Sequence, residues 1–455
     1  MLRTIDESIK TAENIARRVS EMGGRTYFVG GYVRDRLLGI TNTDIDIEVH
    51  GIEPGVLESI LSDTGEMLKI GASFGIYALR GYSIDIALPR TERLTGQGHR
   101  DFDVSFDPYI GTKKAAMRRD FTMNAMMEDV LTGEIVDHFG GVSDIKRGII
   151  RHVSDETYVE DPLRVLRAAQ FASRFRFSID EKTRALSASM DLSFLSRERI
   201  TAELDKALMK AETPSVFFDE LRKMNQLGVW FPELEALIGV PQEPRFHPEG
   251  DAWDHTLAVL DSAANLRDKA EMKREFMYAA MCHDLGKATT TELVGDRIRS
   301  LGHETAGVII ADAMLARLTD EVKLRKYVGN MVLLHMKPNI MAGAGSGVKA
   351  FAKLYDKSVC PADLLLLSKA DRLGQMRENG CEADEAFLKD RLDAYNELMS
   401  RPYVSGADLV NAGFTQCAEF GDALGFAHKL RLSGVPKDIA LKQTAAELKR
   451  LLNTK

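Results

Sequence analysis

The chain has 455 residues, of which 44% are hydrophobic and 28% are charged, so it is long enough for about two to four globular domains. This balance excludes a disordered, collagen-like or disulfide-scaffold protein, and the four cysteines show no CxxC spacing. The N-terminal segment is amphipathic and charged, and no apolar run reaches membrane-spanning length. We therefore expect a cytoplasmic protein without a membrane segment. The net charge of −8 argues against nonspecific polyanion binding but permits a local basic groove.

Residues 1–150 have the pattern of an α/β domain. After an amphipathic helix, a short apolar run predicts a buried strand that ends in the Gly30-Gly31 turn, and a helix follows from near Val33. A second strand is expected over 43–51, and further short strands separated by turn residues continue to about residue 150. This alternation predicts an α/β head.

From about residue 154 the apolar residues recur with the 3.6-residue period of helices. We expect a helical neck over 151–235, and a Pro-rich stretch over 238–253 is the best linker candidate. A helical body over 236–375 and a helical tail over 376–455 complete the expected organisation. The predicted fold class is α+β, with an α/β head followed by an all-helical neck, body and tail.

The sequence Asp44-Ile45-Asp46 is the first candidate for chemistry. A strand projects alternate residues to opposite faces, so both carboxylates share one face while Ile45 points to the core. Converging carboxylates suit Mg²⁺, which completes its coordination with substrate phosphates and water. Asp85 alternates with apolar residues on another expected strand and is a candidate third carboxylate, although a solvated strand residue would give the same pattern.

The Gly30-Gly31 turn lies shortly before this pair of aspartates. The missing side chains permit a phosphate to approach the backbone, and Arg34 supplies a donor within the following helical turn. A triphosphate fits between the turn and the carboxylates. A structural turn beside a surface arginine is the alternative.

Four motifs occur in a characteristic order: FVGGYVRDRLLG at 28–39, TDIDIEV at 43–49, RRDFTMNA at 118–125 and EDPLRVLRAAQF at 160–171. Together they resemble the class II tRNA nucleotidyltransferase and bacterial poly(A) polymerase superfamily. The closest pattern is that of bacterial CCA-adding enzymes with an appended HD domain. The resemblance implies a polymerase-beta-like nucleotidyltransferase head.

By this resemblance, Asp44 and Asp46 hold two Mg²⁺ ions that activate the primer 3′-hydroxyl and stabilise the leaving pyrophosphate, with Asp85 as the possible third catalytic carboxylate. The resemblance places the nucleotide between the glycine turn and the later motifs. The implied nucleotide-binding residues are Gly30, Gly31, Arg34, Arg118, Arg119, Asp120, Asp161, Arg164 and Arg167.

Asp161 and Arg164 are three residues apart on a predicted helix and so share one face. An aspartate accepts from the exocyclic amine of C or A and an arginine donates to the base edge, so the pair can select CTP and ATP without a template. A helix-start ion pair is the alternative. The chain departs from the common family pattern at Gln170, where an arginine is usual. The polar stretch over 91–108 lies where the family has a loop involved in switching from C to A addition.

A second motif series begins near the middle of the chain and resembles the HD phosphohydrolase superfamily. Imidazole and carboxylate ligands suit divalent transition metals such as Ni²⁺, Mn²⁺ or Co²⁺. A lone histidine on an apolar helix face is more often packed than ligating, but here six candidates follow in order on predicted helices. The predicted metal ligands are His255, His283, Asp284, His303, His335 and Asp371.

The HD resemblance implies that His255, His283, Asp284 and Asp371 form the minimal single-metal set. Adding His303 and His335 makes a two-metal centre with Asp284 as the bridge. Lys287 is the candidate phosphate-binding residue. HD-containing relatives are associated with phosphatase and 2′,3′-cyclic phosphodiesterase activities.

We therefore expect a tRNA nucleotidyltransferase that adds or repairs the 3′-terminal CCA from CTP and ATP, with tRNA contacting neck and tail. An A-adding, CC-adding or poly(A) polymerase of the same superfamily is one alternative. A mainly HD-type phosphohydrolase whose head only binds RNA or nucleotide is another. The sequence leaves the oligomeric state open.

Overall fold

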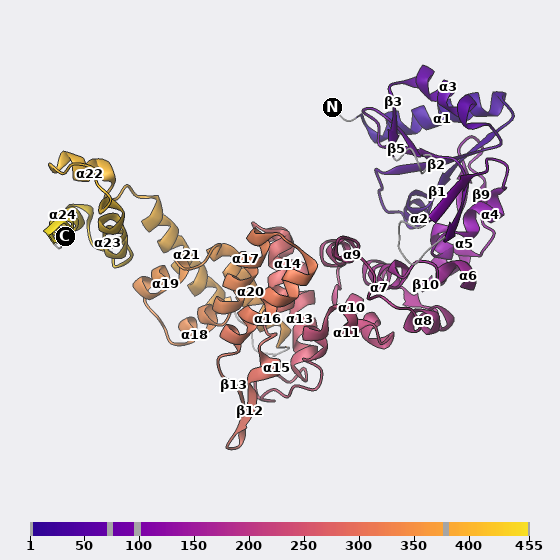
Figure 1. The fold of residues 1–455 in the computed structure, drawn as a ribbon. Helices are drawn as coiled ribbons and strands as arrows, with labels where there is room; N and C mark the ends of the chain where they lie inside the picture. The colour runs from indigo at the N-terminus through magenta and orange to yellow at the C-terminus, as the bar shows by residue number, and fades with distance from the viewer. Residues whose placement is uncertain (1–2, 71–75, 95–101, 376–381, 454–455) are drawn as a thin grey trace. The chain divides into compact units, whose positions relative to one another are not determined.

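The computed structural model describes residues 3–70, 76–94, 102–375 and 382–453 (Figure 1). The chain divides into two compact units, residues 1–232 and 233–455, which are described separately. None of the helices among the described residues is long and apolar enough to cross a membrane. The predicted division into four segments stays a prediction.

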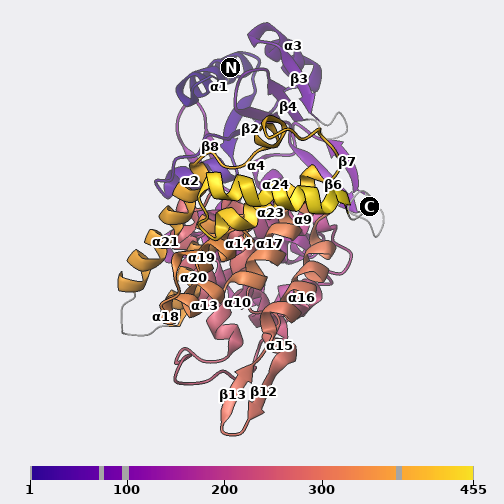
Figure 2. The same cartoon turned by 90° about the vertical axis from the view of Figure 1, so that its left-hand side faces the viewer.

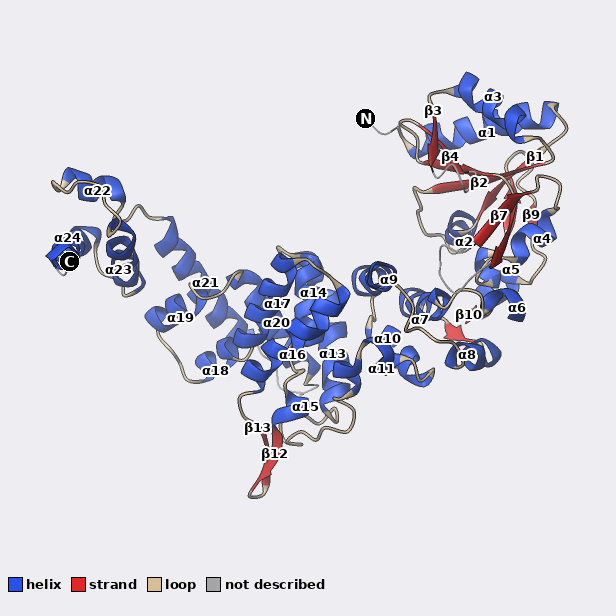
Figure 3. Cartoon of the chain, viewed as in Figure 1, coloured by secondary structure: helices blue, strands red, loops and turns tan. Residues whose placement is uncertain are grey.

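The first unit contains a seven-stranded sheet (Figure 3). Within it β2 and β5 run parallel, and every other neighbouring pair is antiparallel. In spatial order the strands are β3 (Met67–Ile70), β4 (Ile76–Leu79), β5 (Ile84–Ala87), β2 (Ile45–His50), β1 (Arg25–Val29), β8 (Met127–Asp129) and β9 (Ile135–Val136).

A separate antiparallel pair joins β6 (Arg90–Leu94) and β7 (Phe102–Phe106). These strands flank residues 95–101, which lie outside the described residues. The centre of the predicted C-to-A switching loop therefore lies outside the described part of the chain.

Helices cover the sheet because each presents an apolar stripe to it. In α1 (Ile5–Glu21), Ala12, Ile15 and Val19 are spaced at three and four residues and are buried, and a capping box between Thr4 and Glu7 begins the helix. This stripe packs in one core with α3 (Pro54–Thr64) and the inward residues of β1 and β2. A second core is formed by buried residues of α4 (Thr112–Met117), β1 and β8.

The remaining helices of the first unit include α2 (Gly31–Leu37), which begins two residues earlier than Val33, the predicted start. Helix α7 (Leu163–Phe175) packs against both α9 (Arg197–Lys210) and α10 (Ser215–Lys223). The others are α5 (Gly141–Arg147), α6 (Asp155–Tyr158), α8 (Glu181–Ala188), α11 (Leu227–Trp230) and, at the boundary of the units, α12 (Pro232–Glu235). A short parallel pair, β10 (Ile149–Ile150) and β11 (Ser178–Ile179), joins the end of the head to the turn after α7.

The second unit is mainly helical, and α13 (Ala252–Leu266) packs on α14 (Lys273–Cys282) and α20 (Pro361–Gly374) at its centre. The other helices are α15 (Lys287–Thr290), α16 (His303–Leu318), α17 (Val322–Leu334), α18 (Lys337–Gly343), α19 (Val348–Tyr355), α21 (Glu382–Ser400), α22 (Gly406–Asn411), α23 (Phe420–Leu432) and α24 (Lys437–Asn453). Figures 1 and 2 show α23 lying beside α24, and the two bury Phe420 and Leu448 in a small core.

The α+β class with a sheet-containing head and a helical remainder is confirmed. Two details differ: β11 (Ser178–Ile179) lies in the neck that was expected to be all-helical, and β12 (Thr291–Val294) and β13 (Arg297–Ser300) form a hairpin in the body that was expected to be all-helical (Figure 2). The two strands meet at Gly295, which has a φ of +62°. Two short alternating segments around a Gly-Asp turn are a hairpin pattern, and the longer helical period of the flanking residues obscured it.

Candidate functional site

The turn between β1 and α2 passes closely against two charged side chains. Gly30 has a φ of +67°, which side-chain-bearing residues rarely adopt. A Cβ atom at Gly30 would lie 3.0 Å from Nη1 of Arg119 and 3.6 Å from Oδ2 of Asp46. The predicted turn, one predicted arginine and one predicted carboxylate therefore meet at one place.

The acidic residues lie at the start of the parallel strands β2 and β5. Asp46 is directly opposite Asp85 in the register, while Ile45 and Ile47 are buried, as the alternation predicts. Burial raises the pKa of Asp46 to about 6, and Asp85 and Asp44 add to this shift while Arg119 opposes it. Burial and the charge of Asp44 also raise the pKa of Asp85. The buried carboxylates of Asp46 and Asp85, whose pKa values are raised, make this place favourable for a cation.

Glu48, a residue that the sequence analysis did not single out, holds the two arginines of RRDFTMNA. Its carboxylate is 1% exposed and lies 3.5 Å from Nη2 of Arg119, 3.7 Å from Nη2 of Arg118 and 2.9 Å from Nε2 of His50. These contacts lower the pKa of Glu48 to about 2 although burial alone would raise it. Glu48 follows Asp44 and Asp46 at the same period of two, so strand alternation could have predicted that it shares their face of the sheet.

Arg34 is a buried, anchored side chain. Its Nε donates to Asp35 at 2.8 Å and its Nη1 donates to Oδ1 of Asn124 at 2.7 Å. The guanidinium also lies 5.0 Å from the ring centre of Phe171 and 4.8 Å from that of Phe175. Arg34 is therefore held in one orientation by contacts within the protein.

Asp161 and Arg164 lie close to the start of α7, but only Arg164 is within the helix, which begins at Leu163. The expectation that both residues lie on one helix is wrong, because Pro162 stands between Asp161 and the first helical residue. The carboxylate of Asp161 accepts from Nη2 of Arg199 at 2.8 and 3.0 Å. Arg164 donates to the backbone carbonyls of Thr157 and Arg118.

Asp120 joins the loop after α4 to α7. Its Oδ2 accepts from Nε and Nη2 of Arg167, both at 2.7 Å, and its Oδ1 accepts from the Phe121 N–H at 2.8 Å and from Asn124 at 2.9 Å. Burial alone would raise the pKa of Asp120, but Arg167 and these hydrogen bonds lower it. Asp120 is thus an ionised carboxylate that links the loop after α4 to α7 through hydrogen bonds on both sides.

A cavity of about 540 Å³ lies among these groups. Its cationic lining outnumbers its acidic lining, which suits a polyanion such as a triphosphate. Of the predicted residues, Gly30, Gly31, Arg34, Asp46, Arg119, Asp120, Asp161, Arg164 and Arg167 line it. In the described part of the chain, Asp44, Asp85 and Arg118 are not among its lining residues. The lining residues that the sequence analysis had not assigned to the nucleotide site include Asn124, Gln170, Arg174, Arg199, Lys206 and Lys210.

In the second unit the six predicted metal ligands converge from helix ends. Nε2 of His255 lies 3.1 Å from Asp371, 3.4 Å from Asp284 and 3.4 Å from Nε2 of His283. The other oxygen of Asp284 lies 3.3 Å from Nε2 of His303 and 3.7 Å from Nε2 of His335. Asp284 therefore reaches both halves of the group with separate oxygens.

The histidine rings are fixed by their second nitrogen. Nδ1 of His283, His303 and His335 donates to the backbone carbonyl three residues earlier, at 2.8, 2.8 and 2.7 Å. Because Nδ1 carries the proton in each, Nε2 of the neutral ring keeps its lone pair and faces the centre. This tautomer is the one that a metal requires.

Two triads fit a metal by geometry and burial: His255, His283 and Asp371, and Asp284, His303 and His335. All six residues are buried. Nε2 of His303, Nε2 of His335 and Oδ1 of Asp284 have no hydrogen-bond partner among the described residues. Buried polar atoms without partners are costly, so these atoms fit a site built for cations.

Lys287 lies between this group and an adjacent cavity. Its Nζ is 2.6 Å from Asp284 and 2.6 Å from Oε1 of Gln242. The cavity, about 540 Å³, is also lined by His247, Arg299 and Lys337, with apolar surface from Phe246. Cations beside a metal-ligand group and an apolar wall suit a phosphate ester.

Three family models match successive parts of the chain. Residues 26–151 match the Poly A polymerase head domain, residues 176–238 the probable RNA and SrmB-binding site of polymerase A, and residues 252–376 the HD domain. The multifunctional CCA protein of Pasteurella multocida is 36% identical over 440 residues, covering 93% of this chain and 98% of that protein. The multifunctional CCA protein of Laribacter hongkongensis is 38% identical over 399 residues, covering 86% and 92%.

The chain belongs to the multifunctional CCA protein family. The resemblance read from the motifs is confirmed, and the chain is an enzyme of the CCA tRNA nucleotidyltransferase class. Solved structures share its fold at 22% identity: a Thermotoga maritima CCA-adding enzyme complexed with tRNA has a TM-score of 0.64, with 98% of this chain and 99% of that chain covered. A CCA-adding enzyme in complex with ATP has a TM-score of 0.66, with 97% and 94% covered.

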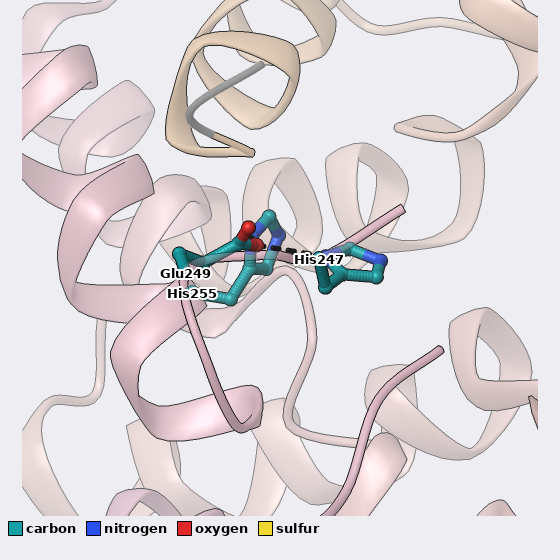
Figure 4. A group of neighbouring side chains, drawn as sticks. All are labelled: His247, Glu249 and His255. Atoms are coloured by element: carbon teal, nitrogen blue, oxygen red, sulfur yellow. Dashed lines mark hydrogen bonds and ion pairs between the residues drawn. The ribbon is translucent and has the colours of Figure 1, made fainter. Parts of the chain in front are cut away.

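Three of the residues that sequence reasoning missed hold charged groups of the two candidate sites. Glu48 holds the paired arginines, Arg199 holds Asp161, and Glu249 hydrogen-bonds to His247 and His255 (Figure 4). Glu48 had a periodic signal. Arg199 and Glu249 had none, because their partners are brought close only by helix packing and by the loop before α13.

Proposed function

We propose that this chain adds or repairs the 3′-terminal CCA of tRNA, using CTP and ATP without a nucleic-acid template. The observation that carries the proposal is the cationic cavity that contains Asp46, the glycine turn and the Asp161–Arg164 segment together. The similarity to multifunctional CCA proteins, and to solved CCA-adding enzymes in complex with tRNA, ATP and CTP, supports the same reaction.

Asp44, Asp46 and Asp85 are the residues that would hold Mg²⁺, because they form the carboxylate cluster with raised pKa values at Asp46 and Asp85. Bound Mg²⁺ would supply charge stabilisation for the attacking and leaving oxygens of nucleotidyl transfer. Arg119, fixed by Glu48, and the turn at Gly30 lie where the triphosphate would bind.

Asp161 and Arg164 are proposed to select the base. Both oxygens of Asp161 accept from Arg199, and Oδ1 also accepts from the Leu163 N–H at 3.1 Å, so Oδ2 is the oxygen with a second lone pair for the exocyclic amine of C or A. A guanidinium has five N–H donors, so the two carbonyl contacts of Arg164 leave further donors for a base edge. U and G offer no amine at the matching position.

The test is incorporation of labelled CTP and ATP, singly and together, into a tRNA transcript that lacks CCA, with Mg²⁺. The proposal predicts two C residues followed by one A, and loss of at least about a thousandfold in rate for Asp46→Asn. Asp63→Asn, an exposed position on α3, is the matched control and should keep the rate. Incorporation of ATP alone would identify an A-adding or poly(A) polymerase instead.

The HD unit supports a second activity, metal-dependent phosphohydrolysis. His255, His283 and Asp371 would hold one divalent transition metal, His303 and His335 a second, and Asp284 would bridge them. Bound metal would supply an activated water and polarise the phosphate. Lys287 stands between Asp284 and the adjacent cavity, where it would bind a substrate phosphate.

A further inference from the structure

Glu249 is a buried carboxylate outside the predicted ligand set. Its side chain is 1% exposed, and Oε1 accepts from Nδ1 of His247 and from Nδ1 of His255, both at 2.8 Å (Figure 4). Its Oε2 has no hydrogen-bond partner among the described residues. Burying a carboxylate costs free energy unless hydrogen-bond donors or opposite charges compensate for the lost hydration. At Glu249 the two histidine Nδ1–H groups are these donors.

His255 differs from the other three histidines of the centre. The Nδ1 atoms of His283, His303 and His335 each donate to the backbone carbonyl three residues earlier. His255 lies in the first turn of α13, and the carbonyl three residues earlier, that of Ala252, accepts instead from the hydroxyl of Thr256 at 2.7 Å. Nδ1 of His255 therefore donates to the carboxylate of Glu249 and not to a backbone carbonyl.

This contact sets the direction of the His255 ring. Since a carboxylate only accepts, Nδ1 carries the proton, and Nε2 is presented to Asp371, Asp284 and His283. A carboxylate behind an imidazole also increases the basicity of the ligating nitrogen more than a neutral carbonyl does. Glu249 therefore both orients His255 and strengthens it as a ligand.

The same oxygen fixes His247, whose ring lies edge-on to that of His255 at a centroid distance of 4.8 Å. His247 lines the cavity beside Lys287. The loop before α13 thus ties a wall of the cavity to a ligand of the centre through one carboxylate.

We propose that Glu249 is a positioning residue for the metal centre, acting through His255 on the half formed by His255, His283 and Asp371. The inference rests on the proposed metal centre. It predicts that Glu249 controls metal affinity although it does not touch the metal.

The test uses full-length, metal-free protein and Co²⁺, with affinity from chelator competition and coordination from visible absorption. Glu249→Ala should weaken one class of bound Co²⁺ by about 10- to 100-fold and change its spectrum. Glu249→Gln should weaken it less, because an amide oxygen still accepts from Nδ1 and only the charge is lost. His247→Ala should bind Co²⁺ within about threefold of wild type, since His255 keeps its partner.

Wild-type Co²⁺ affinity and spectrum in Glu249→Ala would overturn the proposal. An equal loss in His247→Ala and Glu249→Ala would also overturn it, because the effect would then belong to the loop. If Glu249→Ala fails to fold by circular dichroism, the isosteric Glu249→Gln decides, and a wild-type Co²⁺ affinity there refutes the role. Absence of Co²⁺ binding in the wild type would reject the metal centre and this inference together, while CTP and ATP incorporation tests the head independently.

Discussion

The turn after β1 depends on a residue without a side chain. Gly30 combines a positive φ with close approach to Arg119 and Asp46, so it contributes both backbone conformation and space. Gly39 has nearly the same φ, +69°, but nothing lies within 4 Å of the position of its Cβ. A substitution at Gly39 therefore tests the effect of backbone strain alone, whereas the same substitution at Gly30 adds the effect of the close contacts.

Gly30→Ala should lower the free energy of unfolding by about 1–3 kcal/mol and reduce nucleotide incorporation by more than about tenfold. The larger effect on rate is expected because Arg119 or Asp46 must move to make room for the methyl group. Gly39→Ala should show a comparable stability loss with the rate preserved. Urea unfolding and initial incorporation rates measure both, and equal loss of rate in the two variants would contradict the role given to the Gly30 contacts.

At the scale of elements, the nucleotide cavity depends on how α7 is attached to the head. Asp120 and Arg167 link the loop after α4 to α7, and Arg164 donates to the carbonyl of Arg118 in the same region. Arg199 on α9 then holds Asp161 from the other side. Hydrogen bonds between elements, and not the helices alone, place Asp161 and Arg164 at the cavity.

Asp120→Asn should destabilise the protein by about 1.5–3 kcal/mol at pH 7, because the ionised hydrogen bonds to Arg167 are lost. The pKa of Asp120 is lowered in the folded protein, so its contribution is present above the ordinary value of 3.8 and disappears as pH falls through the lower folded pKa. The stability difference between wild type and Asp120→Asn should therefore be constant near neutrality and shrink below about pH 4. Urea titrations between pH 7 and 3 measure it, and a difference that grows on acidification would refute this assignment.

At the scale of the whole molecule, the two candidate sites lie in different compact units and have different ligand chemistry. The head offers carboxylates alone, which suit Mg²⁺, whereas the second unit offers imidazoles with carboxylates, which suit transition metals. We therefore expect the two sites to prefer different kinds of divalent metal.

Treatment with EDTA followed by Mg²⁺ alone should restore CTP and ATP incorporation but leave phosphodiester hydrolysis low until Ni²⁺, Mn²⁺ or Co²⁺ is added. Asp46→Asn should remove only incorporation, and Asp284→Asn should remove only hydrolysis, because Asp284 would contribute an oxygen to each half of the proposed metal centre. Melting curves control for folding. Loss of incorporation in a folded Asp284→Asn protein would contradict separate sites.

The sequence alone predicted the α+β class, the family and the order of the motifs, because each depends on local periodicity and on residue spacing along the chain. The burial of Ile45 and Ile47 beside Asp46 follows directly from strand alternation. The short hairpin at 291–300 and the exact start of α7 after Asp161 were not predicted, since a turn and a proline compete there with helical patterns.

Only the tertiary structure decided which side chains hold the candidate ligands in place. Glu48, Arg199 and Glu249 act on partners brought near by sheet register, helix packing and the loop before α13, and no local pattern reports such distances. The residues that are candidates for metal or phosphate binding can be recognised from the sequence, because only a few side-chain types have the required chemistry. Their orientation depends on neighbours from distant segments, because a buried charge is stable only where the folded chain supplies its partner.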